Sequence, residues 1–324
     1  MQVSAEKIVV LGTGGTIAGK AKAAGDNVGY VAGQVGVHDL LDAVPGLTDA
    51  ARGPLQVEQV AQLDSKDMAF AVWATLAARC HQLLTDPAVR AIVITHGTDT
   101  LEETAWFLHS VLDAHKPVVL TCAMRPATAI APDGPQNLLD AMAVATAPGA
   151  HGVLVVCAGE VHGARQVQKV HPYRVDAFSS GEGGPLGWVE EGRVRLAQNW
   201  HQAHAGWAQA ALEKIAKDAP WPRVEIVMNY AGASGSAVDA LARDGVQGLV
   251  VAATGNGTLH HALQAALERA RQAGVAVRVT TRCLQGQVLA LPGAQAALPL
   301  APGLIPVKAR VSLMLELLVA RAPA

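Results

Sequence analysis

Two threonines stand in a glycine-rich segment that follows a short apolar run near the N-terminus. The segment reads IVVLGTGGTIAGKA over residues 8–21, and its threonines are Thr13 and Thr16. A threonine hydroxyl becomes a nucleophile when a neighbouring base accepts its proton. Glycine-rich backbone lets a substrate approach closely, and its N–H groups can stabilise the negative oxygen that develops during acyl transfer. The segment could therefore hold a catalytic nucleophile.

Two nucleotide-binding motifs fit the same segment incompletely. A P-loop requires G-x-x-x-x-G-K-[ST], and Gly14, Gly19 and Lys20 match it, but Ala21 stands where a Mg²⁺-binding hydroxyl is needed. A dinucleotide fingerprint requires a third glycine where this chain has Ile17. A nucleotide-binding enzyme is therefore the least favoured of the functional hypotheses below.

A second segment, ITHGTDTLEETAWFL, carries a similar set of polar residues. Thr98 and Asp99 follow an apolar run, and the spacing of Thr100 and Glu103 predicts a capping box at the start of a helix. In an open parallel sheet, ligands bind outside the carboxyl ends of the strands. If the two apolar runs are neighbouring strands, the two segments meet at one edge, with a carboxylate between their threonines.

The elements that would position these residues alternate between strand and helix patterns. The apolar runs lack polar alternation, which is typical of parallel strands covered by helices on both faces. We predict an α/β fold whose larger N-terminal domain is a parallel sheet with helices on both faces. Its predicted strands are 7–12, 90–97, 116–124 and 151–159, and its predicted helices are 100–115 and 134–147.

The alternation stops and then restarts in the second half of the chain. Residues 1–195 form the predicted N-terminal domain, residues 196–222 a linker that closes on two prolines, and residues 223–324 a smaller C-terminal α/β domain. The predicted strands of that domain are 223–230, 247–255 and 275–281, and its predicted helices are 236–245, 258–274 and 308–321.

Composition excludes several classes of function. The 324 residues carry 25 basic and 27 acidic side chains without a basic run, so we expect no nucleic-acid partner. No apolar stretch reaches the roughly 18 residues of a membrane span, and MQVSAEKIVVLG leads into the first strand without a signal-peptide pattern, so we expect a cytoplasmic protein.

The cysteines and histidines do not form a metal-binding pattern. None of the four cysteines forms a CxxC pair, and we interpret them as reduced core thiols. His201 and His204 lack the glutamate of a zinc-protease motif and are interpreted as solvated linker residues, and His96 as a hydrogen-bonded structural residue. We therefore expect neither a metal nor another cofactor.

The two threonine segments, LGTGGTIAG (11–19) and ITHGTDTLEETAWFL (94–108), resemble the signatures of the bacterial L-asparaginases and glutaminase-asparaginases of the two-domain type. Weaker similarity extends over nearly the whole chain. The resemblance implies a cofactor-free hydrolase that converts L-asparagine to L-aspartate and ammonia through an acyl-enzyme. It also implies a homotetramer built from close dimers, with C-terminal domains that contribute to the neighbouring subunits' sites.

The resemblance assigns the catalytic roles to five residues. Thr16 matches the nucleophile, and Tyr30, in VGYVAGQVG, matches the tyrosine of a mobile loop that closes over it. Thr98, Asp99 and Lys169 match the second threonine, its aspartate and a buried lysine. The general base remains open: Lys169 must lose its proton first, and an unperturbed tyrosine has a pKa of about 10.

The resemblance assigns further residues to the substrate. Ser65 matches a serine that holds the α-carboxylate, and Asn256 an asparagine that reaches the site from a neighbouring subunit. We expect the backbone N–H groups of Gly15 and Thr98 to form the oxyanion hole, where one such donor lowers the barrier by about 3 kcal/mol.

Two positions depart from the family pattern around the substrate's ammonium group. Many members place Gln or Glu after the binding serine, whereas this chain has Lys66, which would repel an ammonium if it pointed inward. Members often add a glutamate from the neighbouring subunit, whereas residues 269–315 contain no Asp or Glu. Asp99 would then bind the ammonium largely alone.

These departures leave alternatives beside an asparaginase. The chain could be a glutaminase-asparaginase or a hydrolase of another small amide. It could also be a non-catalytic amino-acid-binding protein on the same scaffold.

Overall fold

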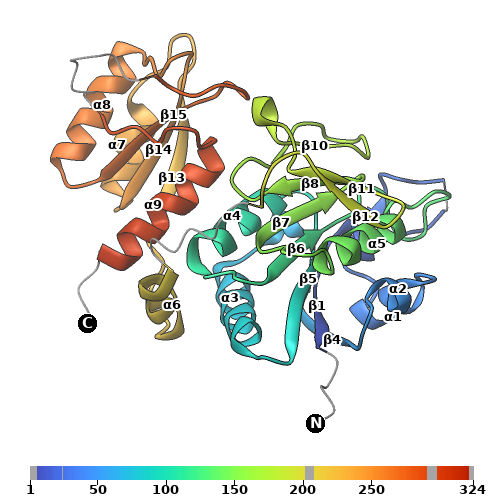
Figure 1. The fold of residues 1–324 in the computed structure, drawn as a ribbon. Coiled ribbons are helices and arrows are strands. Elements are labelled where there is room, and N and C mark those ends of the chain that lie inside the picture. The colour runs from blue at the N-terminus through green and yellow to red at the C-terminus, as the bar shows by residue number, and fades with distance from the viewer. Residues whose placement is uncertain (1–5, 24, 201–207, 290–297, 321–324) are drawn as a thin grey trace. The chain divides into compact units, whose positions relative to one another are not determined.

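The computed structural model describes residues 6–23, 25–200, 208–289 and 298–320. The chain divides into two compact units, Met1–Leu212 and Glu213–Ala324 (Figure 1). Among the described residues, none of the helices combines the length and hydropathy that crossing a bilayer requires.

An eight-stranded sheet forms the centre of the first unit. Its strand order is β12-β11-β8-β7-β6-β5-β1-β4. The neighbouring strands β7, β6, β5, β1 and β4 are parallel, as predicted for this sheet. Strands β8, β11 and β12 extend one edge of the sheet in antiparallel pairing. The bounds are β1 (Lys7–Gly14), β4 (Leu55–Leu63), β5 (Val89–Thr95), β6 (Pro117–Thr121), β7 (Gly152–Cys157), β8 (Glu160–Gly163), β11 (Gly187–Glu190) and β12 (Arg193–Leu196).

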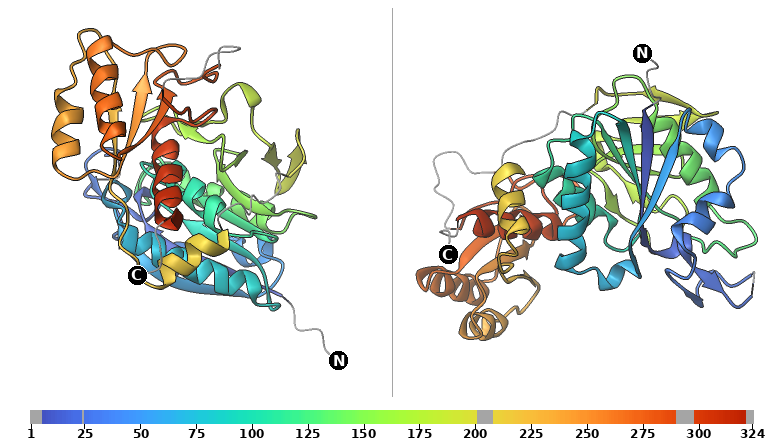
Figure 2. Two further views of the ribbon diagram at one scale, coloured as in Figure 1. Left: turned by 90° about the vertical axis from the view of Figure 1, so that its left-hand side faces the viewer. Right: turned by 90° about the horizontal axis from the view of Figure 1, so that it is seen from below.

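Helices cover both faces of this sheet, as the uninterrupted apolar runs predict. Ile8 and Val10 of β1 pack with Leu138 of α5 in one hydrophobic cluster, while Val9 and Leu11 are equally buried and point to the opposite face. Figure 2 shows helices on either side of the strands. The bounds are α1 (Val37–Asp42), α2 (Leu47–Ala50), α3 (Phe70–Thr85), α4 (Leu101–Val111) and α5 (Gly134–Ala145).

The second unit is a smaller α/β structure, as predicted. Its three parallel strands lie in the order β13-β14-β15. Val238 of α7 and Leu263 of α8 join Val251 of β14 in one core cluster, and α9 packs against all three strands. The bounds are α7 (Ser236–Arg243), α8 (His261–Gln272), α9 (Pro306–Ala320), β13 (Val224–Met228), β14 (Gly248–Ala253) and β15 (Ala276–Thr281).

The stretch interpreted as a linker contains a helix that the sequence analysis did not predict. Helix α6 (Ala208–Ala216) buries Ala211 and Ile215, one turn apart on the same face. The division between the two units falls inside this helix. The linker histidines, His201 and His204, lie outside the described residues.

The cysteines differ in part from the predicted core thiols. All four are free, but only three are buried, and Cys283 is exposed. Cys122 directly follows β6, and Cys157 is the last residue of the neighbouring strand β7. Their Sγ atoms lie 3.7 Å apart.

The topology brings the carboxyl end of β1 beside that of β5. Leu11 pairs with Ile94 and Gly12 with Thr95, and the Thr13 hydroxyl donates to the Thr95 carbonyl oxygen at 2.8 Å. Beyond the strands, the backbones at Gly15 and Gly97 are in direct contact, since a Cβ built on Gly15 would lie 2.3 Å from Gly97 Cα. The loops that carry Thr16 and Thr98 are therefore held together through their glycines.

We predict that Gly15→Ala destabilises the protein far more than Gly149→Ala. Both glycines have a positive φ, 83° and 72°, where an alanine is strained, and a ψ of −173° places Gly15 in a region that is essentially restricted to glycine. Only at Gly15 does the added Cβ meet backbone, whereas nothing lies within 4 Å at Gly149. Melting temperatures of the two variants measure the difference, and equal losses would show that the contact with Gly97 is not restrictive.

Candidate active site

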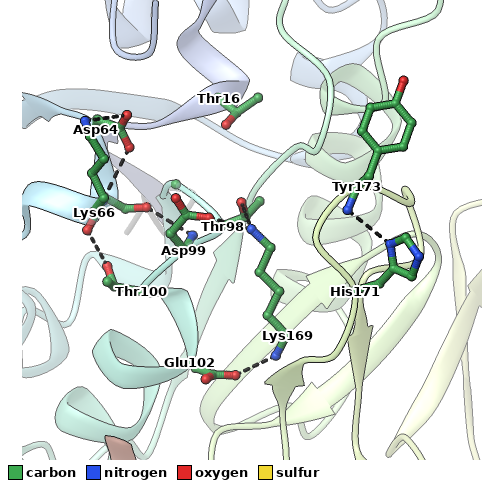
Figure 3. A network of polar contacts seen from close by, with 12 residues as sticks. Thr16, Asp64, Lys66, Thr98, Asp99, Thr100, Glu102, Lys169, His171 and Tyr173 are labelled. Atoms are coloured by element: carbon green, nitrogen blue, oxygen red, sulfur yellow. Dashed lines mark hydrogen bonds and ion pairs between the residues drawn. The ribbon is translucent and has the colours of Figure 1, made fainter. Parts of the chain in front are cut away.

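The predicted site residues of the first unit gather where three strands end. Thr16 follows β1, Ser65 follows β4, and Thr98 with Asp99 follows β5 (Figure 3). The three hydroxyl-bearing residues are buried, with exposed fractions of 6%, 1% and 5%, whereas the Asp99 side chain is 51% exposed. Only the carboxylate at this edge is thus open to solvent.

Thr16 is hydrogen-bonded to Tyr30. The Thr16 Oγ1 and Tyr30 Oη atoms lie 2.7 Å apart, and either can be the donor. Thr16 begins the 3₁₀ helix η1 (Thr16–Ala18), and the short strands β2 (Lys20–Ala21) and β3 (Tyr30–Val31) then pair as an antiparallel hairpin. Gly19 leaves room for the tyrosine, since a Cβ there would lie 2.9 Å from the ring. The hairpin and Gly19 therefore place the Tyr30 hydroxyl beside the Thr16 hydroxyl.

Lys169 joins Thr98 to Asp99. Its ammonium donates to Thr98 Oγ1 at 2.8 Å and to Asp99 Oδ1 at 2.5 Å (Figure 3). Lys169 belongs to the short strand β9 (Gln168–Lys169), which pairs with β10 (Phe178–Ser179). Because the Thr98 oxygen accepts from the lysine, the threonine's own proton is free to be donated elsewhere. The lysine therefore orients this hydroxyl.

Ser65 ties the loop after β4 to the loop after β5. Its hydroxyl oxygen accepts from the Asp99 N–H at 3.1 Å, and its carbonyl oxygen accepts from Thr100 Oγ1 at 2.8 Å. The proton of the Ser65 hydroxyl can then be donated to a bound carboxylate. The predicted capping box is wrong in its first half: Thr100 is the N-cap of α4, but its side chain makes no capping hydrogen bond and binds Ser65 instead.

Lys66 is directed to solvent. Its ammonium lies 2.9 Å from carboxylate oxygens of both Asp64 and Asp67, and its side chain is 61% exposed. Hydrogen bonds to these two carboxylates raise the pKa of Lys66. In this arrangement the residue after the serine belongs to a surface ion-pair cluster, and the assignment of Lys66 to the substrate stays a prediction.

The two expected oxyanion donors differ in availability. The Gly15 N–H donates to the Leu63 carbonyl oxygen at 2.8 Å, so the expectation that it faces an oxyanion is wrong for this structure. The Thr98 N–H donates to no atom of the described residues, and it remains the candidate. Gly15 contributes instead by the close packing of its backbone against Gly97.

A buried chain of hydrogen bonds below the site fixes the peptide that bears this N–H. The His96 ring bonds to the Gly97 carbonyl oxygen at 2.7 Å through Nδ1 and to Thr104 Oγ1 at 2.9 Å through Nε2, and Trp73 Nε1 donates to the same hydroxyl. A carbonyl can only accept, so Nδ1 carries the proton and the neutral ring accepts at Nε2. In a trans peptide the C=O and N–H point in opposite directions, and His96 thereby sets the direction of the Thr98 N–H.

The interpretation of His96 as a structural histidine is confirmed by these bonds. Burial lowers its pKa to about 4, so the ring is neutral near pH 7. Sequence reasoning missed its partner Thr104 and also Trp73, which donates to the Thr104 hydroxyl, because a hydrogen bond between side chains 31 residues apart leaves no local signal.

Glu102 is a further site residue that sequence reasoning missed. Its carboxylate accepts from the backbone N–H of Lys169 at 2.5 Å (Figure 3). Glu102 lies within the second signature, but its spacing to Thr98 and Asp99 gives no indication of a partner 67 residues away.

Asn256 lies in the second unit, where its amide pairs with backbone. Its Nδ2 donates to the Leu289 carbonyl oxygen at 3.1 Å, and its Oδ1 accepts from the Leu289 N–H at 2.7 Å. A contribution of Asn256 to a neighbouring subunit's site stays a prediction.

Comparisons with known proteins agree with the two-unit architecture. The family model "Asparaginase, N-terminal" matches residues 7–202, and "Glutaminase/Asparaginase C-terminal domain" matches residues 223–322. The chain is 38% identical over 322 residues to L-asparaginase 2 of Escherichia coli, covering 98% of this chain and 90% of that protein. It is 38% identical over 275 residues to a glutaminase-asparaginase of Pseudomonas fluorescens biotype A, covering 83% and 74%.

A solved structure shows the same similarity. The crystal structure of a probable cytoplasmic L-asparaginase from Campylobacter jejuni superposes with a TM-score of 0.89 at 38% identity, covering 96% of this chain and 95% of that one.

We predict that acid destabilises the wild type more than His96→Asn. The pKa of His96 in the folded protein lies below its value in the unfolded chain, so between about pH 6.5 and pH 4 the unfolded chain binds more protons. The free energy of unfolding therefore decreases as the pH is lowered through this window. The asparagine variant lacks this group, and the difference between the two free energies of unfolding should shrink by on the order of 1–3 kcal/mol across that window. Urea titrations at both pH values measure it, and a constant difference would contradict the assignment.

Proposed function

The chain belongs to the asparaginase family of amidohydrolases, and from this premise we propose that it hydrolyses the side-chain amide of L-asparagine through an acyl-enzyme on Thr16. The products are L-aspartate and ammonia. The observation that carries the proposal is the hydrogen bond of 2.7 Å between the hydroxyls of Thr16 and Tyr30. It supplies the nucleophile with an adjacent proton acceptor within a buried edge of the sheet.

The proton balance of the first step assigns a route to each atom. Thr16 Oγ1 attacks the amide carbon and forms an ester bond, and its proton passes to Tyr30 Oη. Tyr30 in exchange releases its own proton to the amide nitrogen, which leaves as ammonia. Tyr30 is favoured over Lys169 as the first acceptor because it contacts Thr16 directly, whereas the lysine contacts Thr98. Water then attacks the ester carbonyl, and the departing Thr16 oxygen regains its proton.

The second loop supports the charge that develops in this reaction. The Thr98 N–H is oriented by His96 through the Gly97 carbonyl and can donate to the tetrahedral oxyanion. The Thr98 hydroxyl, whose oxygen accepts from Lys169, can donate its own hydrogen bond to the substrate. Loss of one oxyanion donor typically costs about 3 kcal/mol of barrier.

The two charged groups on the α-carbon of the substrate have different proposed partners. The Ser65 hydroxyl can donate to the α-carboxylate, and the half-exposed Asp99 carboxylate can accept from the α-ammonium. Lys66 cannot accept a hydrogen bond from the α-ammonium, and residues 269–315 contain no Asp or Glu that could do so. This sparse ammonium site favours, as a second candidate, a hydrolase of another small amide. Relatives named as glutaminase-asparaginases, 38% and 35% identical to the chain, support a glutaminase-asparaginase.

We also propose a cytoplasmic homotetramer built from close dimers. The similarity to a protein described as a probable cytoplasmic L-asparaginase supports the compartment, and the resemblance of the signatures supports the assembly. Light scattering of the purified protein measures the number of subunits.

Replacing the nucleophile tests the mechanism directly. Thr16→Ala should reduce ammonia release from asparagine by at least about a thousandfold, because no other hydroxyl occupies that position. Thr16→Ser restores the hydroxyl and should retain measurable turnover, and unchanged melting temperatures would exclude misfolding. Undiminished turnover in the alanine variant would remove Thr16 as the nucleophile.

The orientation of Lys66 predicts a small effect of its replacement. Lys66→Gln should change kcat/KM for asparagine less than about twofold, because exposed ion pairs contribute little. Asp99→Asn should lower it on the order of a hundredfold, since the ammonium loses its charged partner. Both are measured with asparagine, glutamine and their des-amino analogues. A gain of Lys66→Gln confined to substrates with an α-amino group would show that the lysine faces the pocket.

A further inference from the structure

The two-residue strand that carries Lys169 is too short to fix the position of this residue alone. Its strand β9 has two residues and pairs only with β10, outside the eight-stranded sheet. The ladder consists of the pairs Phe178 with Lys169 and Ser179 with Gln168. Two-stranded pairs of this length are marginally stable in water. Another contact must therefore define where the lysine backbone lies relative to the loop after β5.

The contact that the structure supplies is the Glu102 carboxylate. Its Oε2 atom accepts from the Lys169 N–H at 2.5 Å, within the range of charge-assisted hydrogen bonds. Glu102 is half-buried in the first turn of α4, where the helix dipole favours a negative charge. Helix α4 begins directly after the loop that carries Thr98 and Asp99.

The lysine is thereby attached to one rigid segment at both of its ends. Its backbone is held by Glu102, and its ammonium by Thr98 and Asp99, all within five consecutive residues of the chain. With its Cα fixed, the extended side chain reaches the Thr98 hydroxyl in one arrangement. Without Glu102, the backbone of Lys169 would keep its pairing with β10, which the Val170 N–H extends by donating to the Ala177 carbonyl oxygen, but it would lose its hydrogen bond to helix α4.

We propose that Glu102 is a positioning residue for the hydrolysis, and that it acts by fixing the backbone of Lys169 so that the ammonium orients Thr98. The inference rests on the proposed function for its kinetic effect. It concerns geometry rather than charge alone, so a neutral side chain that accepts the same hydrogen bond should replace the glutamate.

Four variants separate positioning from other roles. Glu102→Gln keeps an acceptor of the same length, Glu102→Ala removes it, and Glu102→Met removes it while filling the volume. Glu103→Ala is the matched control, because it removes a carboxylate from the same first turn of α4. We expect Glu102→Gln to retain kcat within about threefold and the Ala and Met variants to lose roughly tenfold to a hundredfold at nearly unchanged KM. Glu103→Ala should behave as the wild type.

A double-variant cycle connects the effect to the lysine. In a Lys169→Met background, Glu102→Ala should lower kcat no further, because the group that it positions is gone. An additive loss would overturn the proposal. So would a Gln variant as slow as the Ala variant, a rise in KM instead of a fall in kcat, or Ala and Met variants that fail to fold while the Gln variant folds.

Amide hydrogen exchange at Lys169 gives a readout without turnover. The Lys169 N–H should exchange slowly in the wild type and in Glu102→Gln, and at least tenfold faster in Glu102→Ala. Equal exchange in all three would overturn the proposed contact. A wild type that releases no ammonia would instead overturn the proposed function, while the exchange rates would still decide whether Glu102 holds the lysine.

Discussion

The site depends on a contact between two glycines. Gly15 and Gly97 follow adjacent parallel strands, and their backbones approach so closely that neither position has room for a Cβ: on Gly97 it would lie 2.5 Å from Ser65 Oγ. The contact draws together Thr16 and Thr98, which lie more than 80 residues apart in the chain. Every further interaction at the site, from the hairpin with Tyr30 to the lysine on β9, adds to this pair of loops.

Charge at the site is distributed so that each group keeps one role. His96 is buried and neutral, and it orients a peptide without exchanging protons near neutral pH. Lys169 is held between a hydroxyl and a carboxylate, and Lys66 is held between two surface carboxylates, outside the reaction. In the proposed mechanism, the proton acceptor that contacts Thr16 is thus the neutral hydroxyl of Tyr30.

The sequence predicted most of the fold because buried parallel strands have a strong apolar signal. The runs at β1, β5, β6, β7 and β14 are confirmed, whereas β4 escaped notice since its half-exposed sequence LQVEQVAQL contains polar residues on the solvent side. Side-chain directions were harder to predict. Lys66 is held by Asp64 and Asp67, which flank it in the sequence but were not considered as its partners. The hydrogen bond between Glu102 and the Lys169 N–H spans 67 residues, and the Gly15 N–H donates to β4, a strand that was not predicted.

Covalent trapping is the most direct measurement of the central claim, that an amide carbon is attacked by Thr16 at the meeting point of the two loops. The protein is mixed with asparagine, quenched in acid within the first turnover and digested with trypsin, and the peptides are sequenced by mass spectrometry. Trypsin cleaves after Lys7 and Lys20, which puts Thr16 in residues 8–20, and after Arg90 and Arg165, which puts Thr98 in residues 91–165, because Lys116 and Arg125 both precede proline. We predict an aspartyl ester on Thr16. An ester on Thr98, or on any other residue, would contradict the account.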